Sequence, residues 1–346
     1  MMEELLFRKA KESDIQKLDE LNNIGFENWN SEFFDELMQP SFAFVSEIGG
    51  EFTGVEGYIG YKLLRDGKTF QSHRSERTIV HPSMRGRGVF EKLVHECHQE
   101  SIKTDSVFCW GATSALKPFQ RAGFKSFEKW RRYYFIPIRS FNLLSFPKDC
   151  ITAYRKFKEF KAEKTIDNFI VLGSAVSNLI PLPHQFNRQF EVVEIKPKAY
   201  VELYDELSLS NDFKLKVDNN ILEWLIKRKI QFKCIKIMNG LKVEAISIYK
   251  YSQNSIVLLD WIFINSISWK NGISSFRNYI KKISGTNCPA AITIAFNIQN
   301  ESHLNDIKSL PIRKIKSPRV GSFVIHPGTL DVGIEKLQLT PIWLEL

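Results

Sequence analysis

Residues 78–90, with the sequence TIVHPSMRGRGVF, restrict what this chain can fold into more than any other segment. A short apolar run, a loop with Gly86 and Gly88, and the start of an amphipathic pattern predict a strand, a tight turn and a helix. Glycines let a ligand approach the backbone closely, and the free N–H groups at a helix N-terminus attract anions. With Arg85 and Arg87 nearby, the segment predicts a cradle for a diphosphate. An ordinary strand-to-helix turn is the alternative.

Two better-known phosphate-binding motifs do not fit this segment. Its spacing differs from the GxxxxGK[ST] loop of nucleotide-hydrolysing proteins. It also lacks the three glycines and the downstream acidic residue of a dinucleotide-binding fold. The ligand class therefore has to come from other features of the chain.

Short apolar segments separated by turns predict the elements of the first 135 residues. Strands are expected at 42–45, at 55–61 before the turn at 66–67, and from about Thr69 to His81. Together they would form an antiparallel meander. A helix should follow, since apolar residues recur at helical spacing from Val89 to Cys97.

The rest of the chain predicts a connector and a second set of similar elements. Residues 138–190 carry a charged amphipathic helix followed by an apolar one. Beyond residue 191 we expect helices near 200–207 and 220–228, strands at 232–238, 243–251 and 255–264, a helix at 272–283 and a strand at 291–296. This order echoes the first half and predicts a duplicated architecture with diverged sequence.

Composition excludes several classes of protein. The chain has 346 residues, 43% of them hydrophobic, which is enough for two packed domains and excludes disordered, collagen-like and disulfide-scaffold proteins. Five cysteines without CxxC spacing speak against a disulfide framework or a zinc site. We find no apolar stretch long enough to span a bilayer and no signal peptide, and therefore expect a cytoplasmic protein.

The net charge of +9 fits an anionic ligand such as a polyphosphate as well as it fits nucleic acid. No RNP-type motif, zinc-finger spacing or long basic block supports nucleic acid, so we expect none as a partner, and no membrane.

Two motifs resemble those of one enzyme family. The run Arg85-Gly86-Arg87-Gly88, after a strand that ends in Val80-His81-Pro82, resembles the acyl-CoA-binding motif Q/R-x-x-G-x-G/A of the GNAT acetyltransferase superfamily. Residues 117–124, KPFQRAGF, are similar to the family's Y-x-x-x-G-F helix and turn. The two lie at the separation that the family shows. The resemblance covers roughly residues 5–135.

The resemblance implies an α/β (α+β) fold with two GNAT-like domains, each a mixed, mostly antiparallel twisted sheet flanked by helices. Residues 1–137 would be the GNAT domain with the acyl-CoA site, and 138–190 a helical connector. Residues 191–346 would be a degenerate GNAT-like copy without the R-x-x-G-x-G loop, forming the acceptor cleft.

The resemblance also implies that acyl-CoA, as acetyl-CoA or 3-hydroxybutyryl-CoA, is the co-substrate, and we expect no metal. The residues expected to bind it come from the strand end, the loop, the helix start and the second motif: Thr78, Ile79, Val80, Arg85, Gly86, Arg87, Gly88, Val89, Phe90 and Phe119.

Two of these residues depart from the family pattern. Phe90 is bulky where the last small residue of the first motif is expected. Phe119 stands where the family often has a tyrosine that protonates the departing thiolate, and phenylalanine has no proton to donate. Either the thiolate leaves unprotonated, or Tyr133, Tyr134 or a water molecule replaces that donor.

For the mechanism, the resemblance implies that the pantetheine arm adds beside the strand at 78–80. A backbone N–H near Thr78 would stabilise the oxyanion, a contribution of about 3 kcal/mol in other enzymes.

The base that accepts the amine proton is expected nearby. We predict Glu76, because strand alternation places it on the same face as Thr78. The alternative is that Glu76 is paired with Arg74 or Arg77. His81 is a second candidate, with a capping role as its alternative.

Cys109 and Trp110 lie on the next strand. There they either line an acyl pocket or belong to the core. The sequence shows no Ser-His-Asp or Cys-His-Asn arrangement, which speaks against covalent catalysis.

Residues 218–224, DNNILEW, resemble the D-x-x-x-L-x-W helix of tandem-GNAT proteins from bacterial polysaccharide clusters. This likeness implies a sugar N-acyltransferase whose acceptor is a nucleotide-linked amino sugar, such as a dTDP-3-amino-3,6-dideoxyhexose, in O-antigen or capsule assembly. Two alternatives stay open: a transferase that acts on a peptide, protein or antibiotic amine or uses aminoacyl-tRNA, and a non-catalytic acyl-CoA-binding module. A homodimer is also an open expectation.

Overall fold

The computed structural model describes residues 4–21 (without 15 and 19), 41–127 (without 114), 131–138, 144–179 (without 164, 165 and 178), 190–264 (without 208–210, 253 and 254), 266–297 (without 286–288 and 290), 313–314 and 322–343 (without 341 and 342). The chain forms two compact units. The first comprises residues 1–128 and 321–334, and the second residues 129–320 and 335–346.

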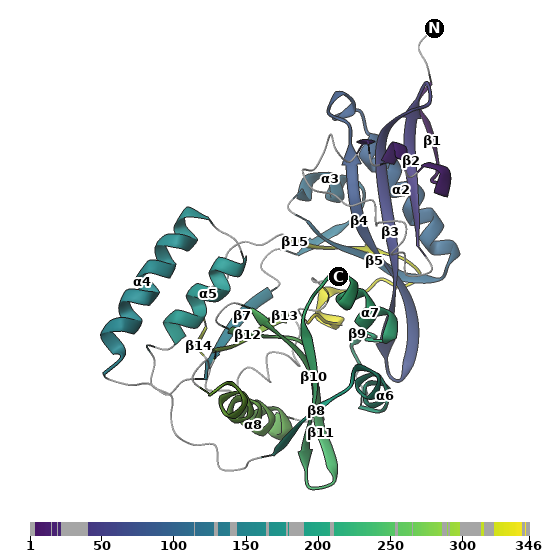
Figure 1. Cartoon of the computed structure of the whole chain (residues 1–346). Coiled ribbons are helices and arrows are strands. Elements are labelled where there is room, and N and C mark those ends of the chain that lie inside the picture. Colours follow the sequence, from purple (N-terminus) through teal and green to yellow (C-terminus); the bar gives the residue numbers. More distant parts are fainter. Residues whose placement is uncertain are drawn as a thin grey trace. The chain divides into compact units, whose positions relative to one another are not determined.

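A twisted sheet forms the centre of the first unit (Figure 1). Its strand order is β1-β2-β3-β4-β5-β15-β6, and all neighbours are antiparallel except β4 and β5, which are parallel. The strands are β1 (Leu6–Lys9), β2 (Phe42–Ile48), β3 (Glu51–Arg65), β4 (Lys68–Val80), β5 (Ser106–Thr113), β6 (Lys125–Phe127) and β15 (Ser322–Pro327).

Tight turns shape the predicted meander of β2, β3 and β4. Asp66 and Gly67, which join β3 to β4, have φ angles of 50° and 70°. Two consecutive positive φ angles are typical of the two-residue turn that suits the twist of a hairpin. The meander is therefore confirmed, with strands longer than the sequence pattern indicated.

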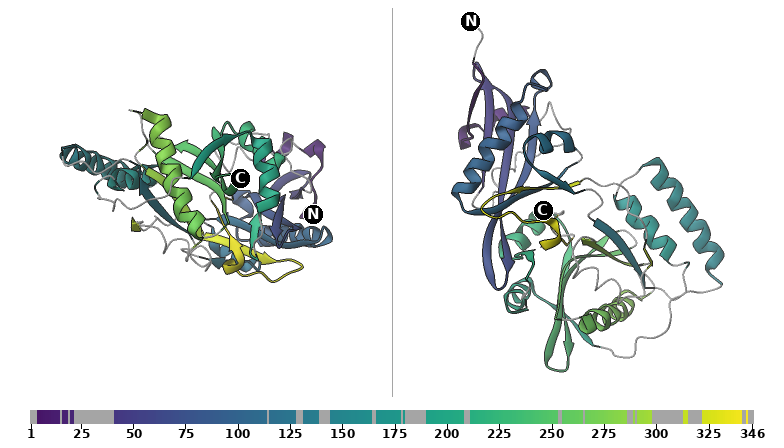
Figure 2. Two further views of the ribbon diagram at one scale, coloured as in Figure 1. Left: turned by 90° about the horizontal axis from the view of Figure 1, so that it is seen from below. Right: turned by 180° about the vertical axis from the view of Figure 1, so that it is seen from behind.

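Helix α2 (Val89–Lys103) packs on one face of this sheet (Figure 2). Its apolar stripe is buried as predicted, with Leu93, Val94 and Cys97 fully inaccessible to solvent. Short helices flank it: η1 (Glu12–Asp14), η3 (Pro82–Met84) and α3 (Leu116–Arg121).

The second unit is built on a sheet with the order β14-β7-β13-β12-β11-β10-β8. Its strands are β7 (Arg131–Pro137), β8 (Glu191–Ile195), β10 (Phe232–Asn239), β11 (Lys242–Ser252), β12 (Ser255–Phe263), β13 (Ala291–Asn297) and β14 (Arg313–Lys314). The unit also contains β9 (Phe213–Leu215) and β16 (Leu337–Gln338), which pair with each other in parallel outside this sheet. Its helices are α4 (Phe146–Ala162), α5 (Ile166–Ser177), α6 (Pro197–Leu207), α7 (Asn219–Lys227) and α8 (Ser266–Ser284), and η5 is Ile334–Lys336.

The predicted duplication is visible in the order of elements. In each unit three antiparallel strands are followed by a helix and then by a parallel strand: β2-β3-β4, α2 and β5 in the first, and β10-β11-β12, α8 and β13 in the second. The strand that flanks the parallel strand comes from the other part of the chain, since β15 pairs with β5 and β7 pairs with β13. The two halves have thus exchanged a strand.

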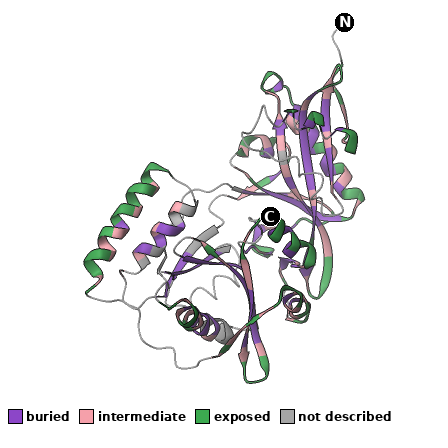
Figure 3. Ribbon diagram, in the orientation of Figure 1, coloured by how far each residue is buried: buried purple, intermediate pink, exposed green. Residues whose placement is uncertain are grey.

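The predicted mixed α/β fold, with two mostly antiparallel sheets flanked by helices, is confirmed, whereas the two units are not the linear segments of the sequence-based division. Residues 131–137 belong to the second sheet and residues 322–327 return to the first. The strands of both sheets are mostly buried, and α4 is mostly exposed (Figure 3). The roles assigned to residues 138–190 and 191–346 stay predictions.

Candidate active site

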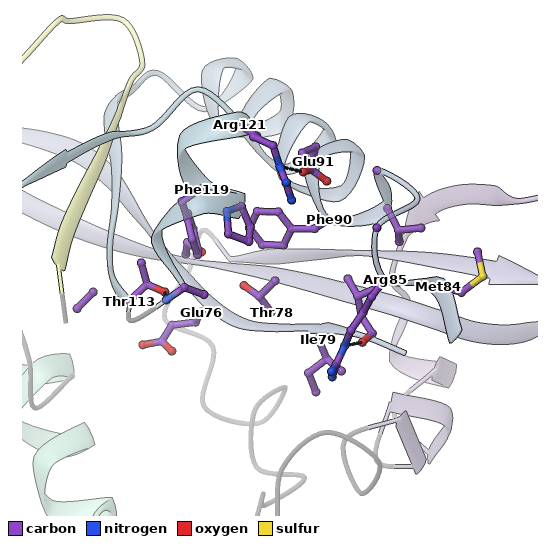
Figure 4. Close-up of a pocket in the computed structure, with 18 residues that line it drawn as sticks. Glu76, Thr78, Ile79, Met84, Arg85, Phe90, Glu91, Thr113, Phe119 and Arg121 are labelled. Atoms are coloured by element: carbon purple, nitrogen blue, oxygen red, sulfur yellow. Dashed lines mark hydrogen bonds and ion pairs between the residues drawn. The ribbon is translucent and has the colours of Figure 1, made fainter. Parts of the chain in front are cut away.

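A cavity of about 630 Å³ opens in the first unit between the ends of β4 and β5 (Figure 4). The residues that line it come from the end of β4, the loop before α2, the start of α2, the end of β5, and α3. Ten of the twelve residues predicted for the site line it: Glu76, Thr78, Ile79, Val80, Arg85, Gly86, Gly88, Val89, Phe90 and Phe119. Arg87 and His81 are not among the lining residues.

The cavity exists because β4 and β5 diverge. Their pairing runs from Gln71 to Arg74 on β4, and the following part of β4 leaves its neighbour. A β-bulge on β4 accompanies this divergence, since Val55 of β3 faces Ile79 whereas Gly57 faces Glu76. The bulge adds one residue to β4 and bends it. Backbone groups at the end of β4 keep β3 as a partner but have none on the side of β5, as the predicted binding of a pantetheine arm requires.

The bulge also changes which side chains share a face. The hydroxyls of Ser75 and Thr78 both donate to the carboxyl group of Glu56 on β3, which strict alternation would not allow for residues three apart. Glu76 therefore lies on the opposite face, and its side chain leaves the strand in a different direction from that of Thr78 (Figure 4). The prediction that Glu76 and Thr78 share a face is wrong.

The glycine loop adopts the open conformation that the sequence indicated. Gly86 and Gly88 have φ angles of 77° and 76°, and a Cβ atom at either position would meet no atom within 4 Å. Left-handed backbone at both positions favours glycine over any residue with a side chain. The unfilled space beside them leaves the N-terminus of α2 accessible to an anion.

Two side chains stabilise the turn that leads into this loop. The Nε of Arg85 donates to the carbonyl oxygen of Val80 at 3.2 Å. The ring of His81 caps η3, because its Nδ1 accepts from the backbone N–H of Ser83 at 3.2 Å. The structure thus gives His81 the capping contact that stood as the alternative to a catalytic role.

An aromatic cluster forms the wall contributed by α2 and α3. The rings of Phe90 and Phe119 pack edge to face with centroids 5.0 Å apart, and Phe119 packs in the same way on Phe124 at 5.1 Å. The two departures from the family pattern therefore contact each other. Phe119 is nearly buried and brings no hydroxyl to the cavity, so the wall is apolar at this point.

Arg121 and Glu91 bridge the mouth of the cavity. The Nε of Arg121 on α3 lies 2.6 Å from Oε1 of Glu91 on α2. Both residues are charged and border the glycine loop, yet nothing in the sequence pattern distinguished them from ordinary surface residues. An exposed pair of this kind contributes little to stability.

The carboxyl group of Glu56 lies beneath the cavity and is inaccessible to solvent. Ser75 Oγ donates to its Oε1 at 2.6 Å and Thr78 Oγ1 donates to its Oε2. Burial raises the pKa of Glu56 to about 8, although the two hydroxyl hydrogen bonds oppose that shift. The sequence offered a signal that we did not use: Glu56 is a charged residue inside the otherwise apolar strand segment VEGYIGY.

Glu76 borders the cavity from the other face of β4. Its Oε1 lies 2.7 Å from Nη2 of Arg74, which is the ion pair that the sequence left open. The Arg74 guanidinium also lies over the ring of Trp110, 5.3 Å from its centroid. Arg74 Nε and Nη1 are buried and lack a hydrogen-bond partner among the residues that the structure describes.

Cys109 and Trp110 are fully buried and do not line the cavity, which favours their core role. Cys109 belongs to the cluster around Val94 and Cys97, and Trp110 stacks on Phe323 with centroids 5.8 Å apart.

Of the two tyrosines proposed as proton donors, Tyr134 is buried in the core of the second unit, and the side chain of Tyr133 lies outside the described part. In the described part of the chain, no three His, Cys, Asp or Glu side chains are grouped to hold a metal ion, and none of its helices could span a membrane.

Comparison with known proteins identifies the first part of the chain. Residues 7–127, about a third of the chain, match the family model of the acetyltransferase (GNAT) domain. No curated protein sequence gives a match.

Solved structures resemble the chain over most of its length. A protein of unknown function from Enterococcus faecalis V583, described as a probable N-acyltransferase, is 11% identical over 97% of this chain and 75% of that chain, with a TM-score of 0.65. A GCN5-related N-acetyltransferase from Anabaena variabilis is 13% identical over 93% and 72%, with a TM-score of 0.60. N-myristoyltransferase from Saccharomyces cerevisiae with bound myristoyl-CoA is 11% identical over 96% and 84%, with a TM-score of 0.50. At these identities the likeness shows the fold.

Proposed function

We propose, from the premise that residues 7–127 are a GNAT acetyltransferase domain and the chain is an acyltransferase, that the cavity binds acyl-CoA and passes its acyl group to an amine. The amine would attack the thioester carbon directly. An amide bond forms, the carbon–sulfur bond breaks, and the products are the acylated amine and free coenzyme A. The donor would be acetyl-CoA or 3-hydroxybutyryl-CoA.

The observation that carries this proposal is the cavity itself. It joins a diverging strand end to a left-handed glycine loop at the N-terminus of α2. Amide groups and the helix dipole at that terminus suit a diphosphate, and the end of β4, which has no partner on the side of β5, suits an extended amide-containing arm. Coenzyme A carries both groups on one molecule, with the amide-containing pantetheine arm attached to the diphosphate.

For the acceptor we propose a nucleotide-linked amino sugar, such as a dTDP-3-amino-3,6-dideoxyhexose. The net charge of +9 supports this class. Glu76 remains a candidate for the base that receives the amine proton.

One observation favours a second function, a non-catalytic acyl-CoA-binding module. Phe119 leaves the cavity without the phenolic donor expected at that position. The other alternative is a transferase that acts on a peptide, protein or antibiotic amine or uses aminoacyl-tRNA.

Free thiols at the buried Cys97, Cys109 and Cys234 support our expectation of a reducing, cytoplasmic environment.

Calorimetry with coenzyme A tests the binding site. We expect Gly88→Asp to abolish binding, because a carboxylate would occupy the space of the diphosphate. Gly67→Asp is the matched control: Gly67 has a φ of 70° and open space around it, in a turn far along the sheet from the cavity. It shares the backbone strain and should bind normally. Equal affinity of wild type and Gly88→Asp would refute the role of the loop.

A thiol-release assay tests the reaction and the acceptor. Acetyl-CoA and 3-hydroxybutyryl-CoA are offered with dTDP- and UDP-linked amino sugars, peptide amines and aminoglycosides. We expect thiol release with a nucleotide-linked amino sugar. Release with a peptide or antibiotic amine would transfer the proposal to that acceptor class. Coenzyme A binding without release across the whole panel would favour the non-catalytic module.

A further inference from the structure

Glu56 is a buried acidic group with a direct connection to the cavity. Its carboxyl group has no solvent exposure, whereas Thr78, which hydrogen-bonds to its Oε2, lines the cavity. The β4 bulge makes this connection, since it brings Thr78 onto the face where Glu56 and Ser75 meet. The Thr78 hydroxyl therefore connects the cavity to the buried carboxyl group of Glu56.

The surroundings of Glu56 favour its protonated form over a wide pH range. The titratable groups that influence its charge are Tyr58 on β3, Cys109 on β5, Cys97 on α2 and, from the opposite face of β4, Glu76, all of which are neutral or negative. Burial is the main cause that raises the pKa of Glu56 to about 8, and the charge of Glu76 adds to it. An alkyl thiol such as a cysteine side chain has a pKa of about 8.5. A proton can therefore pass between this carboxyl group and a thiolate at little cost in free energy.

We propose that Glu56 stores the proton that acyl transfer releases and that the Thr78 hydroxyl relays it; this inference rests on the proposed function. When the amine attacks the thioester, its nitrogen gives a proton to Thr78 Oγ1 as the Thr78 hydroxyl proton passes to the Glu56 carboxylate. As the carbon–sulfur bond breaks, the proton returns along the same path to the sulfur. The amide and the free thiol leave, and Glu56 is again a carboxylate.

This route gives the cavity a proton donor that the aromatic wall lacks. Phe119 cannot protonate the thiolate, and its ring is packed against Phe90 and Phe124. One carboxyl group that first accepts and then returns a proton needs no separate acid. Thr78 is the group that contacts substrate, and Glu56 acts through it as a positioning residue.

The pH dependence of kcat tests the relay. In wild type, kcat should rise with pH, with a midpoint near the pKa of Glu56, and reach a plateau above that pH, because the carboxylate form is required. Glu56→Gln keeps the acceptor oxygen but not the proton site, and should lower kcat by about 10²-fold and remove this limb. Thr78→Val should do the same, and Thr78→Ser should retain the limb.

Two further variants separate this from a structural role. Ser75→Ala removes a hydrogen bond that favours the Glu56 carboxylate, so the limb should move to higher pH. Glu51→Gln, an exposed substitution on the same strand, should leave rate and profile unchanged. If Glu76→Gln removes the limb while Glu56→Gln and Thr78→Val keep it, Glu76 is the base and the relay is refuted.

Infrared titration keeps this result distinct from failure of the proposed function. A protonated carboxyl band should disappear with a midpoint near pH 8 in wild type and be missing in Glu56→Gln, with no substrate present. A Glu56 that is already ionised at pH 6 overturns the inference, whatever the activity. A normal titration with no thiol release from any amine overturns the proposed function, and the relay with it.

Discussion

At the scale of single residues, the most consequential side chain is a carboxyl group placed inside a sheet. Burying an acid raises its pKa, so its ionisation is linked to unfolding. Glu56 has a folded-state pKa of about 8 against about 4.3 for a free glutamate. Between these values the unfolded chain releases a proton that the folded chain retains. The stabilising contribution of Glu56 to the free energy of unfolding is therefore fully present below the unfolded-state pKa. It is lost as the pH rises through the folded-state pKa.

We expect Glu56→Gln to flatten the pH dependence of stability. In wild type this group should reduce the free energy of unfolding by about 1.4 kcal/mol per pH unit between the two pKa values. Between about pH 5.5 and 8, the difference in free energy of unfolding between wild type and Glu56→Gln should shift by on the order of 3 kcal/mol. Urea denaturation at both pH values measures it. Glu51→Gln is the control, and a constant difference for Glu56→Gln would contradict the assigned pKa.

Most lining residues could be predicted from the sequence, because the loop motif fixes a local geometry. The orientation of Glu76 could not, since a bulge shifts the alternation by one residue and leaves no mark in the sequence. Glu56 was missed for another reason: its partners, Ser75 and Thr78, are distant in sequence and meet it through strand pairing.

At the scale of elements, the two units share more than their order of strands. On β12, Ile248 faces Asp260 whereas Tyr249 faces Leu258, so this strand carries a bulge beyond the point where its pairing with β13 ends at Val257. In the first unit, a bulge on β4 beyond the end of its parallel pairing with β5 likewise accompanies the opening of the cavity. In the second unit Asp260 is buried and hydrogen-bonded by Tyr200 and Thr340.

The sequence showed no cofactor loop in the second half, and in the second unit the bulged strand carries a buried carboxyl group within a polar network. Lys214 also lies near Asp260, with Nζ 3.9 Å from Oδ1, and its Nζ donates to the carbonyl oxygen of Trp261 at 2.6 Å. Such a network is costly to disrupt one partner at a time. Short-range patterns predicted the strands, but not the partners of the charged side chains buried beside them.

Where β15 ends, the backbone passes very close to β5. An added Cβ at Gly328 would lie 2.2 Å from the carbonyl oxygen of Ser106 and 3.0 Å from the backbone of Val107. Thr329 and Leu330 then donate hydrogen bonds back to those two carbonyl groups. A glycine is therefore required here for close approach.

We expect Gly328→Ala to destabilise the protein by about 1–3 kcal/mol, because backbone atoms cannot yield as a flexible side chain can. The midpoint of urea unfolding measures the effect. Gly111→Ala on β5 is the control, since its Cβ would meet Val324 at an ordinary 3.5 Å. If both variants unfold at the same urea concentration, the close approach is not tight in solution.

At the scale of the whole molecule, the exchange of strands decides which pieces can stand alone. The first sheet needs β15 from residues 322–327, which covers the apolar strand β5 and links it to β6. Sequence patterns suggested a boundary near residue 137 because the motifs end there. Strand exchange involves contacts about two hundred residues apart, which no local pattern encodes.

We expect a fragment of residues 1–137 to aggregate or to unfold without a cooperative transition. Loss of β15 would expose β5, including Trp110, which stacks on Phe323 in the complete chain. A chimera of residues 1–128 joined to 321–334 through a Gly/Ser linker is the control and should recover cooperative unfolding. Size-exclusion chromatography and tryptophan fluorescence in urea compare them. Identical behaviour of the two would show that β15 is dispensable.

The pairing of Thr113 with Ser322 has a consequence for how the protein is made on the ribosome. At about 5–20 residues per second, translation would take roughly 10–40 s to pass from one to the other. During that interval the nascent domain has an unpaired, apolar β5 edge, which is a hazard for association between neighbouring polysomal chains. Chaperone dependence during synthesis would then be a property of this topology.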